Sequence, residues 1–570
     1  MGLVTGALQI GRSALLAYQS ALQVVGNNVS NAGSANYTRQ TPELSGLIGA
    51  NLPEGFMAGG GVALTALRRN VDASLENRLR IATGDQAGAL AEEATLSRIE
   101  SVMNELSDSD LSSLLQNFFN SFSTLQNTPH DTAARGMVIT AADSLIREIQ
   151  RQRVDVLGMR DELNTQLQND AEGVDLLSRQ VADLNVRITA LESSSKGSSG
   201  SLRDQRDDLL RQMSEIVQIQ VRDQPDGSVN VYIGNELFIS GGISRGMTTT
   251  LETTDNEPRV VVRFADNMRE VSLIGGEMAG LVEARDGDLL GHVQALNSLS
   301  QALIHEVNKV HASGQGIRGY TDLTGAFDVS DLDAALNSAE ANLDLTPQNG
   351  TFILYVTDTN TDPATRVATT IEVDLDGIGA DDSLRTLAGK IDAAANVRAE
   401  ATADGRLRII ADDGYEVTFG EDTSSVLAAL GVNVFFTGSN SEDLSVNADL
   451  ADDSSLLAAA THHAVGDGGN AASIAELASK SLSGLRGQSM TEFFNAIASD
   501  VATRSNAAQA GVKSANTIVS SLTAQRESIS GVSLDEEAIA MLRFERAFQA
   551  AARYTTVVDQ MIQETLAIVS

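Results

Sequence analysis

The sequence predicts a mainly α, elongated, multi-domain protein with β-containing insertions, in which the helices at the two ends of the chain pair as a coiled coil. Two apolar stripes, one at each end, alternate steps of three and four residues and predict this pairing. A block from 317 to 450 contains short strand-like runs and lies between long stretches of helical period. This block therefore indicates an α+β domain inserted into a long helical bundle.

The C-terminal stretch predicts one long helix that begins at about Ser533. Ser533 and Glu536 have the spacing of a capping box, in which each side chain binds an orphan backbone N–H of the other residue. The apolar seam of this helix is Met541, Phe544, Phe548, Ala551, Thr555, Val558, Ile562, Thr565 and Val569. A long helix with one apolar side gains little stability alone, so it needs a partner.

The N-terminal stretch repeats the same spacing. Its seam is Leu8, Gly11, Leu15, Tyr18, Leu22, Val25 and Val29. The two terminal helices could therefore pair with each other, or each stripe could instead pack on a globular core. After Val29 the helical pattern gives way to a run rich in Asn, Ser and Gly, which predicts a turn or an arm up to residue 40.

Charge and composition exclude several classes of partner and chemistry. The 570 residues include 76 acids and 40 bases, so the net charge of -36 repels nucleic acid and anionic membrane surfaces. No apolar run reaches the length of a membrane span. The chain has no cysteine, which removes disulfides and thiolate metal sites. Residues 1–5 lack the features of a cleaved signal peptide, so we expect any export to use another route.

The changes of period along the chain predict five segments. We expect residues 41–65 to be irregular, because Pro42, Pro53 and Gly59 to Gly61 interrupt any regular pattern. Pro225-Asp226-Gly227 between two alternating runs predicts a β-hairpin. The predicted segments are an N-terminal coiled-coil helix and arm (1–40), the first part of a helical bundle with a small β-hairpin region (41–316), an inserted α+β domain (317–450), the second part of the bundle (451–530) and a C-terminal coiled-coil helix (531–570).

The candidate catalytic and metal-binding motifs fail on spacing. His305 and His311 are six residues apart, ~240° around a helix, so both cannot face one zinc ion. The neighbouring His462 and His463 favour a surface loop. The run from Asp374 to Asp382 lacks the closing glutamate of a calcium loop and favours a solvated acidic turn. The sequence thus predicts no enzyme, no metal and no cofactor.

The two ends of the chain carry segments of a known type. Gly26-Asn27-Asn28-Val29-Ser30-Asn31-Ala32, followed by Tyr37 and Arg39, resembles the signature of the axial proteins of the bacterial flagellum, which reads approximately NNVANANTPGY. The present chain lacks the Pro-Gly of that signature. Three further segments resemble the hook-associated members of this family: Val307-Asn308-Lys309-Val310-His311, Phe435-Phe436-Thr437-Gly438 and Gly531-Val532-Ser533-Leu534-Asp535-Glu536-Glu537-Ala538.

The resemblance implies a structural protein that forms the junction between hook and filament and pairs its terminal helices in the inner wall of the tube. It implies subunit contacts through Leu15, Tyr18, Leu22, Val25, Val29, Leu534, Met541, Phe544, Phe548, Val558 and Ile562. Asn27, Asn28 and Asn31 would shape the exit from the first helix. The implied partners are further copies in a helical ring, the hook protein, a second junction protein (hook-associated protein 3) and a cytoplasmic export chaperone on the C-terminal region. The implied location is extracellular, on the flagellum, after type III export.

Two other functions stay open on the sequence. The chain could be another axial protein, either the hook protein or the second junction protein, although its length and C-terminal segment argue against both. It could also be a secreted scaffold whose 317–450 insertion carries a hydrolase or an adhesin.

Overall fold

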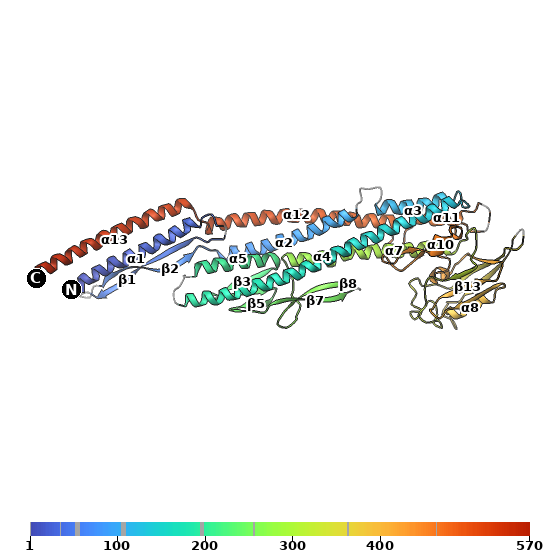
Figure 1. The fold of residues 1–570 in the computed structure, drawn as a ribbon, viewed down its shortest axis with the longest axis horizontal. Coiled ribbons are helices and arrows are strands. Elements are labelled where there is room, and N and C mark those ends of the chain that lie inside the picture. Colours follow the sequence, from blue (N-terminus) through green and yellow to red (C-terminus); the bar gives the residue numbers. More distant parts are fainter. Residues whose placement is uncertain are drawn as a thin grey trace. The chain divides into compact units, whose positions relative to one another are not determined.

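The computed structural model describes residues 2–34, 36–51, 57–103, 110–193, 199–254, 257–361, 364–462, 464 and 466–569. These residues fold into two units (Figure 1). The terminal unit contains Met1–Thr95, Asp161–Arg285 and Asn506–Ser570, and the middle unit contains Leu96–Arg160 and Asp286–Ser505. Long helices with several small sheets make up both units, which confirms the predicted mainly α class with β insertions.

Most elements belong to one unit, but four pass from one unit into the other. The elements that pass are α2 (Ala73–Met103), α4 (Thr132–Glu192), the π-helical turn η1 (Ala284–Leu289) and α12 (Met490–Ser530). The terminal unit also contains α1 (Gly2–Ser30), β1 (Gln40–Asn51), β2 (Met57–Arg69), α5 (Gly200–Ile216), β3 (Ile219–Asp223), β4 (Val229–Ile233), β5 (Glu236–Ser240), β6 (Ile243–Ser244), β7 (Met247–Thr254), β8 (Glu257–Phe264), α6 (Glu277–Glu283) and α13 (Leu534–Val569).

The segment expected to be irregular after residue 40 is a long antiparallel hairpin, so that prediction was wrong. β1 and β2 pair from Gln40 with Arg69 onward, with Pro42 opposite Leu67 and a bulge between Gly46 and Ile48 that accommodates Gly60 and Gly61; Pro53 lies outside the described residues. The hairpin lies on α1, where Ser13 Oγ accepts a hydrogen bond from the Val62 N–H at 3.3 Å. Gly61 has φ +102°, and a Cβ there would lie 2.0 Å from Ser13 Oγ. Packing on α1 therefore stabilises strands that their own composition disfavours.

Two buried Asn–Arg pairs attach the small sheets to α4. Asn185 donates to the carbonyls of Val229 and Gly241 at 3.0 and 2.8 Å, and its Oδ1 accepts from Arg206 at 3.0 Å. Farther toward the start of the helix, Asn164 Oδ1 accepts from the Val260 N–H at 3.0 Å and from Arg285 at 2.9 Å. Each asparagine thus satisfies a strand's backbone groups within a buried contact, which fixes where the sheet docks.

The helices of the terminal unit pack through a small apolar cluster. Leu75, Leu79 and Ala82 of α2 contact Leu522 of α12. Beside the cluster, Arg526 donates to Glu76 at 2.7 Å, and both side chains are largely buried.

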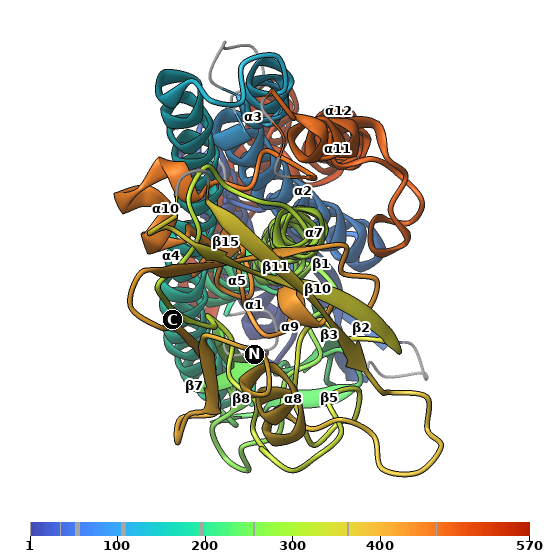
Figure 2. The same ribbon diagram turned by 90° about the vertical axis from the view of Figure 1, so that its right-hand side faces the viewer.

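The middle unit includes residues 317–450, the block that the sequence predicts to be an inserted α+β domain. Its elements are α3 (Leu111–Leu125), α7 (Leu290–Ala312), β9 (Asp322–Thr324), β10 (Gly350–Asp358), β11 (Thr365–Val373), α8 (Leu384–Asp392), β12 (Val397–Ala401), β13 (Leu407–Ala411), β14 (Tyr415–Gly420), α9 (Val426–Ala429), β15 (Phe436–Thr437), β16 (Ser445–Val446), α10 (Ala448–Asp452), the 3₁₀ turns η2 (Ser454–Leu456), η3 (Leu477–Ser479) and η4 (Ser483–Leu485), and α11 (Gly469–Glu476). Two three-stranded antiparallel sheets, ordered β11-β10-β14 and β12-β13-β9, share one apolar core with α8. Figure 2 shows the paired strands β10 and β11, with α8 below them in that view.

Two segments that resemble the flagellar proteins meet in the middle unit. Asn308 of α7 accepts hydrogen bonds from the N–H groups of Phe435 and Phe436 at 3.0 and 2.9 Å and donates to the Phe436 carbonyl at 2.8 Å. Phe435 and Phe436 in turn contact Phe118 of α3, with ring centroids 5.8 and 5.6 Å away. The conformation of this loop therefore depends on one buried amide and a cluster of aromatic rings.

Replacing Asn308 with alanine should destabilise the middle unit by about 3 kcal/mol, because three hydrogen bonds are lost and buried backbone groups are left unpaired. The midpoint of thermal unfolding measures this loss. Gln301→Ala, at an exposed position of the same helix, serves as the control and should change little. Equal effects of the two substitutions would contradict the role given to Asn308.

An acidic pair in the terminal unit makes stability depend on pH. Burial, with a smaller contribution from the charge of Glu277 on α6, raises the pKa of Asp170 on α4 from 3.8 to about 7. Asp170 Oδ2 is buried without a hydrogen-bond partner among the described residues. Between these two pKa values the native state holds a proton that the unfolded chain has released, so the stability contributed by this site falls as pH rises.

Asp170→Asn should therefore raise the midpoint of thermal unfolding at pH about 8 and leave it nearly unchanged at pH about 3, where both states are largely protonated. Asp183→Asn, on the exposed side of the same helix, is the control. A difference between Asp170→Asn and the wild type that is the same at both pH values would contradict this account.

Among the described residues, no helix combines the length and the apolar character needed to cross a lipid bilayer.

Candidate assembly interface of the terminal helices

The two terminal helices lie against each other in the terminal unit (Figure 1). Ala21 and Val25 of α1 form a buried cluster with Phe544 of α13. Toward the start of α1, Gly11 approaches α13 so closely that a Cβ would lie 2.4 Å from Thr555 Oγ1. Because later residues of α1 meet earlier residues of α13, the helices are antiparallel. Burying a side chain such as Phe544 contributes about 2 kcal/mol, which is little for helices of this length.

A polar network, here called the terminal lock, joins the end of α1 to the start of α13. It consists of Asn28, Tyr37, Arg39 and Glu537. Arg39 Nε donates to Glu537 Oε1 at 2.7 Å, and Asn28 Nδ2 donates to Glu537 Oε2 at 2.9 Å. The Glu537 side chain is only 2% exposed. Burying a carboxylate this deeply is unfavourable unless it is paired and hydrogen-bonded, so the lock couples two segments about 500 residues apart in the chain.

Tyr37 holds Asn28 in place within the lock. Its hydroxyl donates to Asn28 Oδ1 at 2.7 Å, and the same oxygen accepts from the Gln40 N–H at 3.1 Å. Burial, helped by the charges of Asp204 and Glu537, raises the Tyr37 pKa to about 12. The hydroxyl therefore stays protonated and remains a donor at physiological pH.

The other predicted helix-exit and capping residues surround the lock. Asn31 Nδ2 donates to the Asn27 carbonyl at 2.9 Å, and Asn27 Nδ2 donates to the Tyr37 hydroxyl at 3.3 Å. The Glu536 N–H lies 3.5 Å from Ser533 Oγ, which places Ser533 at the N-cap of α13. The Glu536 carboxylate does not return to Ser533 as a capping box requires, because it forms an ion pair with Arg39 instead.

The structure divides the predicted contact residues by burial. Val25, Phe544 and Val558 are buried; Leu15, Tyr18, Leu22, Phe548 and Ile562 are half-buried; Val29, Leu534 and Met541 are exposed. The pairing of the two helices therefore accounts for only part of the predicted seam.

A second apolar face of α13, here called the outer stripe, has no counterpart in the predicted seam. It consists of Ile539, Tyr554, Val557 and Met561, which are between 42% and 68% exposed. At ~100° per residue these positions lie within ~60° of one another and between ~80° and ~140° around the helix from Phe544. A helix that is apolar on two faces is typical of a helix with two partners. The 3–4 spacing of Tyr554, Val557 and Met561 in the sequence is a signal that could have revealed the outer stripe.

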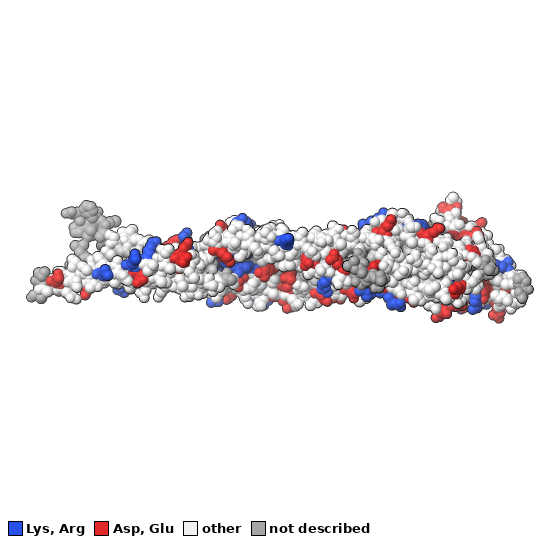
Figure 3. All heavy atoms as spheres, turned by 90° about the horizontal axis from the view of Figure 1, so that it is seen from above, with Lys and Arg blue, Asp and Glu red and all other residues white. Residues whose placement is uncertain are grey.

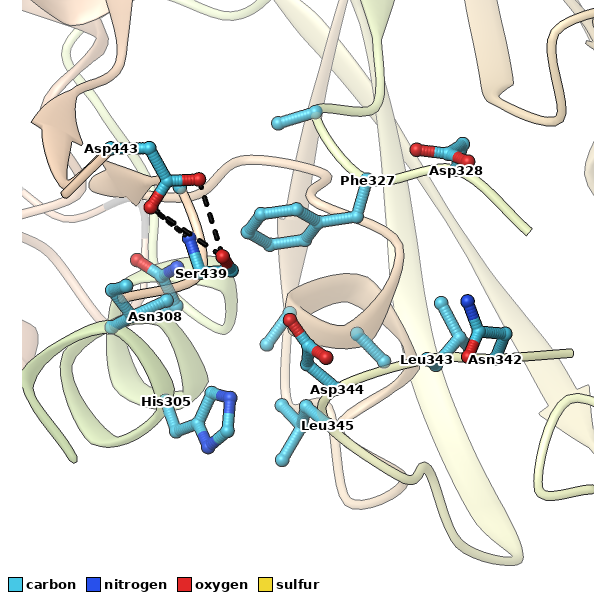
Figure 4. A pocket seen from close by; sticks show the side chains of 15 residues that line it. His305, Asn308, Phe327, Asp328, Asn342, Leu343, Asp344, Leu345, Ser439 and Asp443 are labelled. Atoms are coloured by element: carbon cyan, nitrogen blue, oxygen red, sulfur yellow. Dashed lines mark hydrogen bonds between the residues drawn. The ribbon is translucent and has the colours of Figure 1, made fainter. Parts of the chain in front are cut away.

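The histidines of the rejected zinc motif have separate roles. His311 is fully buried, its Nδ1 lies 2.8 Å from the Asn433 carbonyl oxygen, and its Nε2 accepts from the Ala458 N–H at 3.0 Å. Burial lowers its pKa to about 4. Since both ring nitrogens are engaged, His311 has no free position for a metal. His305 instead lines a cavity of about 400 Å³ with Phe327 and Asp344 (Figure 4). His462 is exposed, and His463 lies outside the described residues.

The acidic turn in the inserted domain brings three carboxylates together. One oxygen each of Asp374, Asp376 and Asp381 lies within 4.8 Å of the others. Asp381 accepts from the Gly377 N–H at 2.9 Å and Asp376 from the Ile378 N–H at 2.7 Å, as in a solvated turn.

Several known flagellar proteins are similar to this chain. The family described as flagellar hook-associated protein FlgK helical domain matches residues 96–327, and the family described as flagellar basal body rod FlgEFG protein C-terminal matches residues 523–568. Flagellar hook-associated protein 1 of Escherichia coli (strain K12) is 26% identical, with 95% of each chain covered. The proteins of the same name from Salmonella typhimurium (strain LT2) and Bacillus subtilis (strain 168) are 25% and 24% identical, and each comparison covers 98% of this chain.

A solved structure, titled as the flagellar hook junction protein FlgK from Burkholderia pseudomallei, has the same fold. It superposes with a TM-score of 0.51 and 13% sequence identity, and the match covers 80% of this chain and all of that one.

The paired terminal helices and these matches define the chain as an axial structural protein of the bacterial flagellum. Within this class, the chain belongs to the family of flagellar hook-associated protein 1.

Glu537→Ala should destabilise the contact between α1 and α13 by about 3 kcal/mol, because Arg39 and Asn28 lose a buried charged partner. Hydrogen exchange of the backbone amides at the start of α13 measures the effect. Glu536→Ala removes the other, 61% exposed, carboxylate on Arg39 and should cost less than about 1 kcal/mol. If the two variants exchange equally fast, burial of Glu537 does not hold the helices together.

Proposed function

We propose that the chain is the structural junction between the flagellar hook and filament, and that it assembles with further copies through its paired terminal helices. The outer stripe of α13 carries this proposal, because it leaves a row of large apolar side chains exposed beside an interface that is already formed. Val557 and Met561 are 53% and 60% exposed, more than a soluble helix with a single partner requires. Membership of the hook-associated protein 1 family supports the same location.

The proposed assembly has two levels. The inner face of α13 pairs with α1 of the same chain, and the terminal lock fixes where the two helices begin and end. The outer stripe, together with the exposed Val29, Leu534 and Met541, contacts neighbouring subunits in a helical ring. Leu16 of α1, which is also exposed, would meet a neighbour in the same layer.

The proposed partners follow from this position. The hook protein lies on one side of the ring and a second junction protein, hook-associated protein 3, on the other. Before export, a cytoplasmic chaperone covers the C-terminal helix, since its outer stripe would otherwise be exposed to water. We place the assembled protein outside the cell, on the flagellum, after type III export.

The proposed role needs neither catalysis nor nucleic acid. His311, the most suggestive catalytic candidate, is fully occupied by backbone groups. On the face shown in Figure 3, acidic and basic side chains are interspersed, which is typical of a solvated protein surface. Together with the net charge of -36, this surface disfavours binding to a phosphate backbone.

Val557→Asp should prevent incorporation into flagella, because it places a charge in the outer stripe without touching the buried pair of α1 and α13. We expect filaments to be lost or shed, the motile fraction to fall to the level of a deletion strain, and the thermal unfolding of the purified chain to stay unchanged. Electron microscopy of cells that carry only the variant gene measures incorporation.

Thr556→Asp is the matched control. Thr556 is exposed one position earlier and ~100° around the helix from Val557, outside the outer stripe. Normal flagella with Val557→Asp, or equal loss with both variants, would argue against the outer stripe as a contact between subunits.

A further inference from the structure

A cavity of about 380 Å³ in the terminal unit brings several arginines together. It lies among the end of β2, the start of α2, α5 and the hairpin of β3 and β4. Four arginines line it: Arg69, Arg80, Arg203 and Arg206. Four acids line it as well, so the formal charges of the lining cancel: Glu76, Glu192, Asp207 and Asp223. Which of these groups are paired with one another therefore decides what the cavity can bind.

Two of these arginines are neutralised by carboxylates. Arg69 donates to Asp204 and to Asp207, each at 2.6 Å. Arg203 donates to both oxygens of Glu192, at 2.8 and 2.7 Å. The carboxylates at this end of the cavity are therefore already in use.

The remaining acids do not complete the balance. Glu76 lines the cavity but is bound by Arg526 at 2.7 Å. Asp223 lies on an exposed position of β3. This leaves Arg80 and Arg206 without a carboxylate that accepts a hydrogen bond from them among the described residues.

Arg80 is the least satisfied group in the cavity. It is 8% exposed, no described residue accepts a hydrogen bond from its guanidinium, and its Nε is buried without a partner. Burial lowers its pKa despite the charges of Asp207, Glu76 and Asp223. A guanidinium offers five N–H donors, and a buried cation without an acceptor is strongly unfavourable.

Arg206 directs a second guanidinium to the same cavity. It is 1% exposed, and its Nη1 donates to Asn185 Oδ1 at 3.0 Å and to the Gly227 carbonyl at 2.9 Å. Both acceptors are neutral, and its Nε has no partner among the described residues. Its charge is therefore held in place but not balanced by a bound carboxylate.

We propose that this cavity binds a small oxoanion, such as inorganic phosphate or sulfate, between Arg80 and Arg206. The planar fork of a guanidinium matches the oxygens of a tetrahedral oxoanion, and such charge-assisted hydrogen bonds are the strong ones. The volume is also sufficient for the anion and several waters, since one water occupies ~30 Å³. The bound anion joins α2 and α5, which come from distant parts of the chain.

Isothermal titration of the full chain with inorganic phosphate, at an ionic strength held constant with sodium chloride, tests the proposal. We expect saturable binding of one phosphate per chain and a rise in the midpoint of thermal unfolding that saturates over the same concentrations. Arg80→Met should weaken binding by about tenfold or more, because the charge-assisted hydrogen bonds are lost.

Arg78→Met is the matched control, since Arg78 is exposed two residues away on the same helix. It should bind phosphate as the wild type does. If Arg80→Met fails to fold, Arg80→Lys keeps the charge without the fork and should show weakened binding. The proposal is overturned if the wild type shows no saturable binding, or if the folded Arg80 variant binds as tightly as the wild type.

Discussion

The buried carboxylate of Glu537 is the interaction on which the arrangement of the chain's two ends depends. Its partners come from the end of α1 and from the arm that follows, so α13 can begin in this place only when the N-terminal segment is in position. The Arg39 N–H also donates to the Ser530 carbonyl at 3.0 Å, which ties the end of α12 to the same point. A charge in such a site is unfavourable unless all partners are present, so the lock favours one pairing of the helices over others.

The apolar contact between α1 and α13 has a different role from the lock. It is narrow, built around Ala21, Val25 and Phe544, and relies on Gly11 for close approach. It lies on one face of α13, so the outer stripe on another face of the same helix is free for a second partner. The small sheets that pack on α4 follow the same pattern. Buried asparagine and arginine side chains fix where each sheet docks on the helix, while apolar side chains supply the buried contact surface.

Periodicity in the sequence was sufficient to predict the long helices, because a helix of many turns repeats its signal many times. It left open whether the two terminal helices pair with each other or pack on a globular core, and the resemblance to flagellar proteins favoured the pairing. The hairpin of β1 and β2 was missed, since its glycines and Pro42 suggest a loop and its stability comes from α1.

The capping box of Ser489 and Glu492, which starts α12, was present in the sequence but not singled out. In contrast, the capping box predicted at Ser533 is incomplete, because the Glu536 carboxylate forms an ion pair with Arg39. Arg39 is far away in the sequence, so local spacing could not reveal this ion pair. The buried partners of Glu537 were hidden for the same reason.

Cryo-electron microscopy of intact flagella at the hook–filament junction tests the central claim most directly. The account predicts one narrow ring of this chain between hook and filament, with Phe544 against α1 of the same subunit and Val557 and Met561 buried against a neighbouring subunit. A ring in which the outer stripe faces water, or density for this chain along the hook or filament, would contradict it.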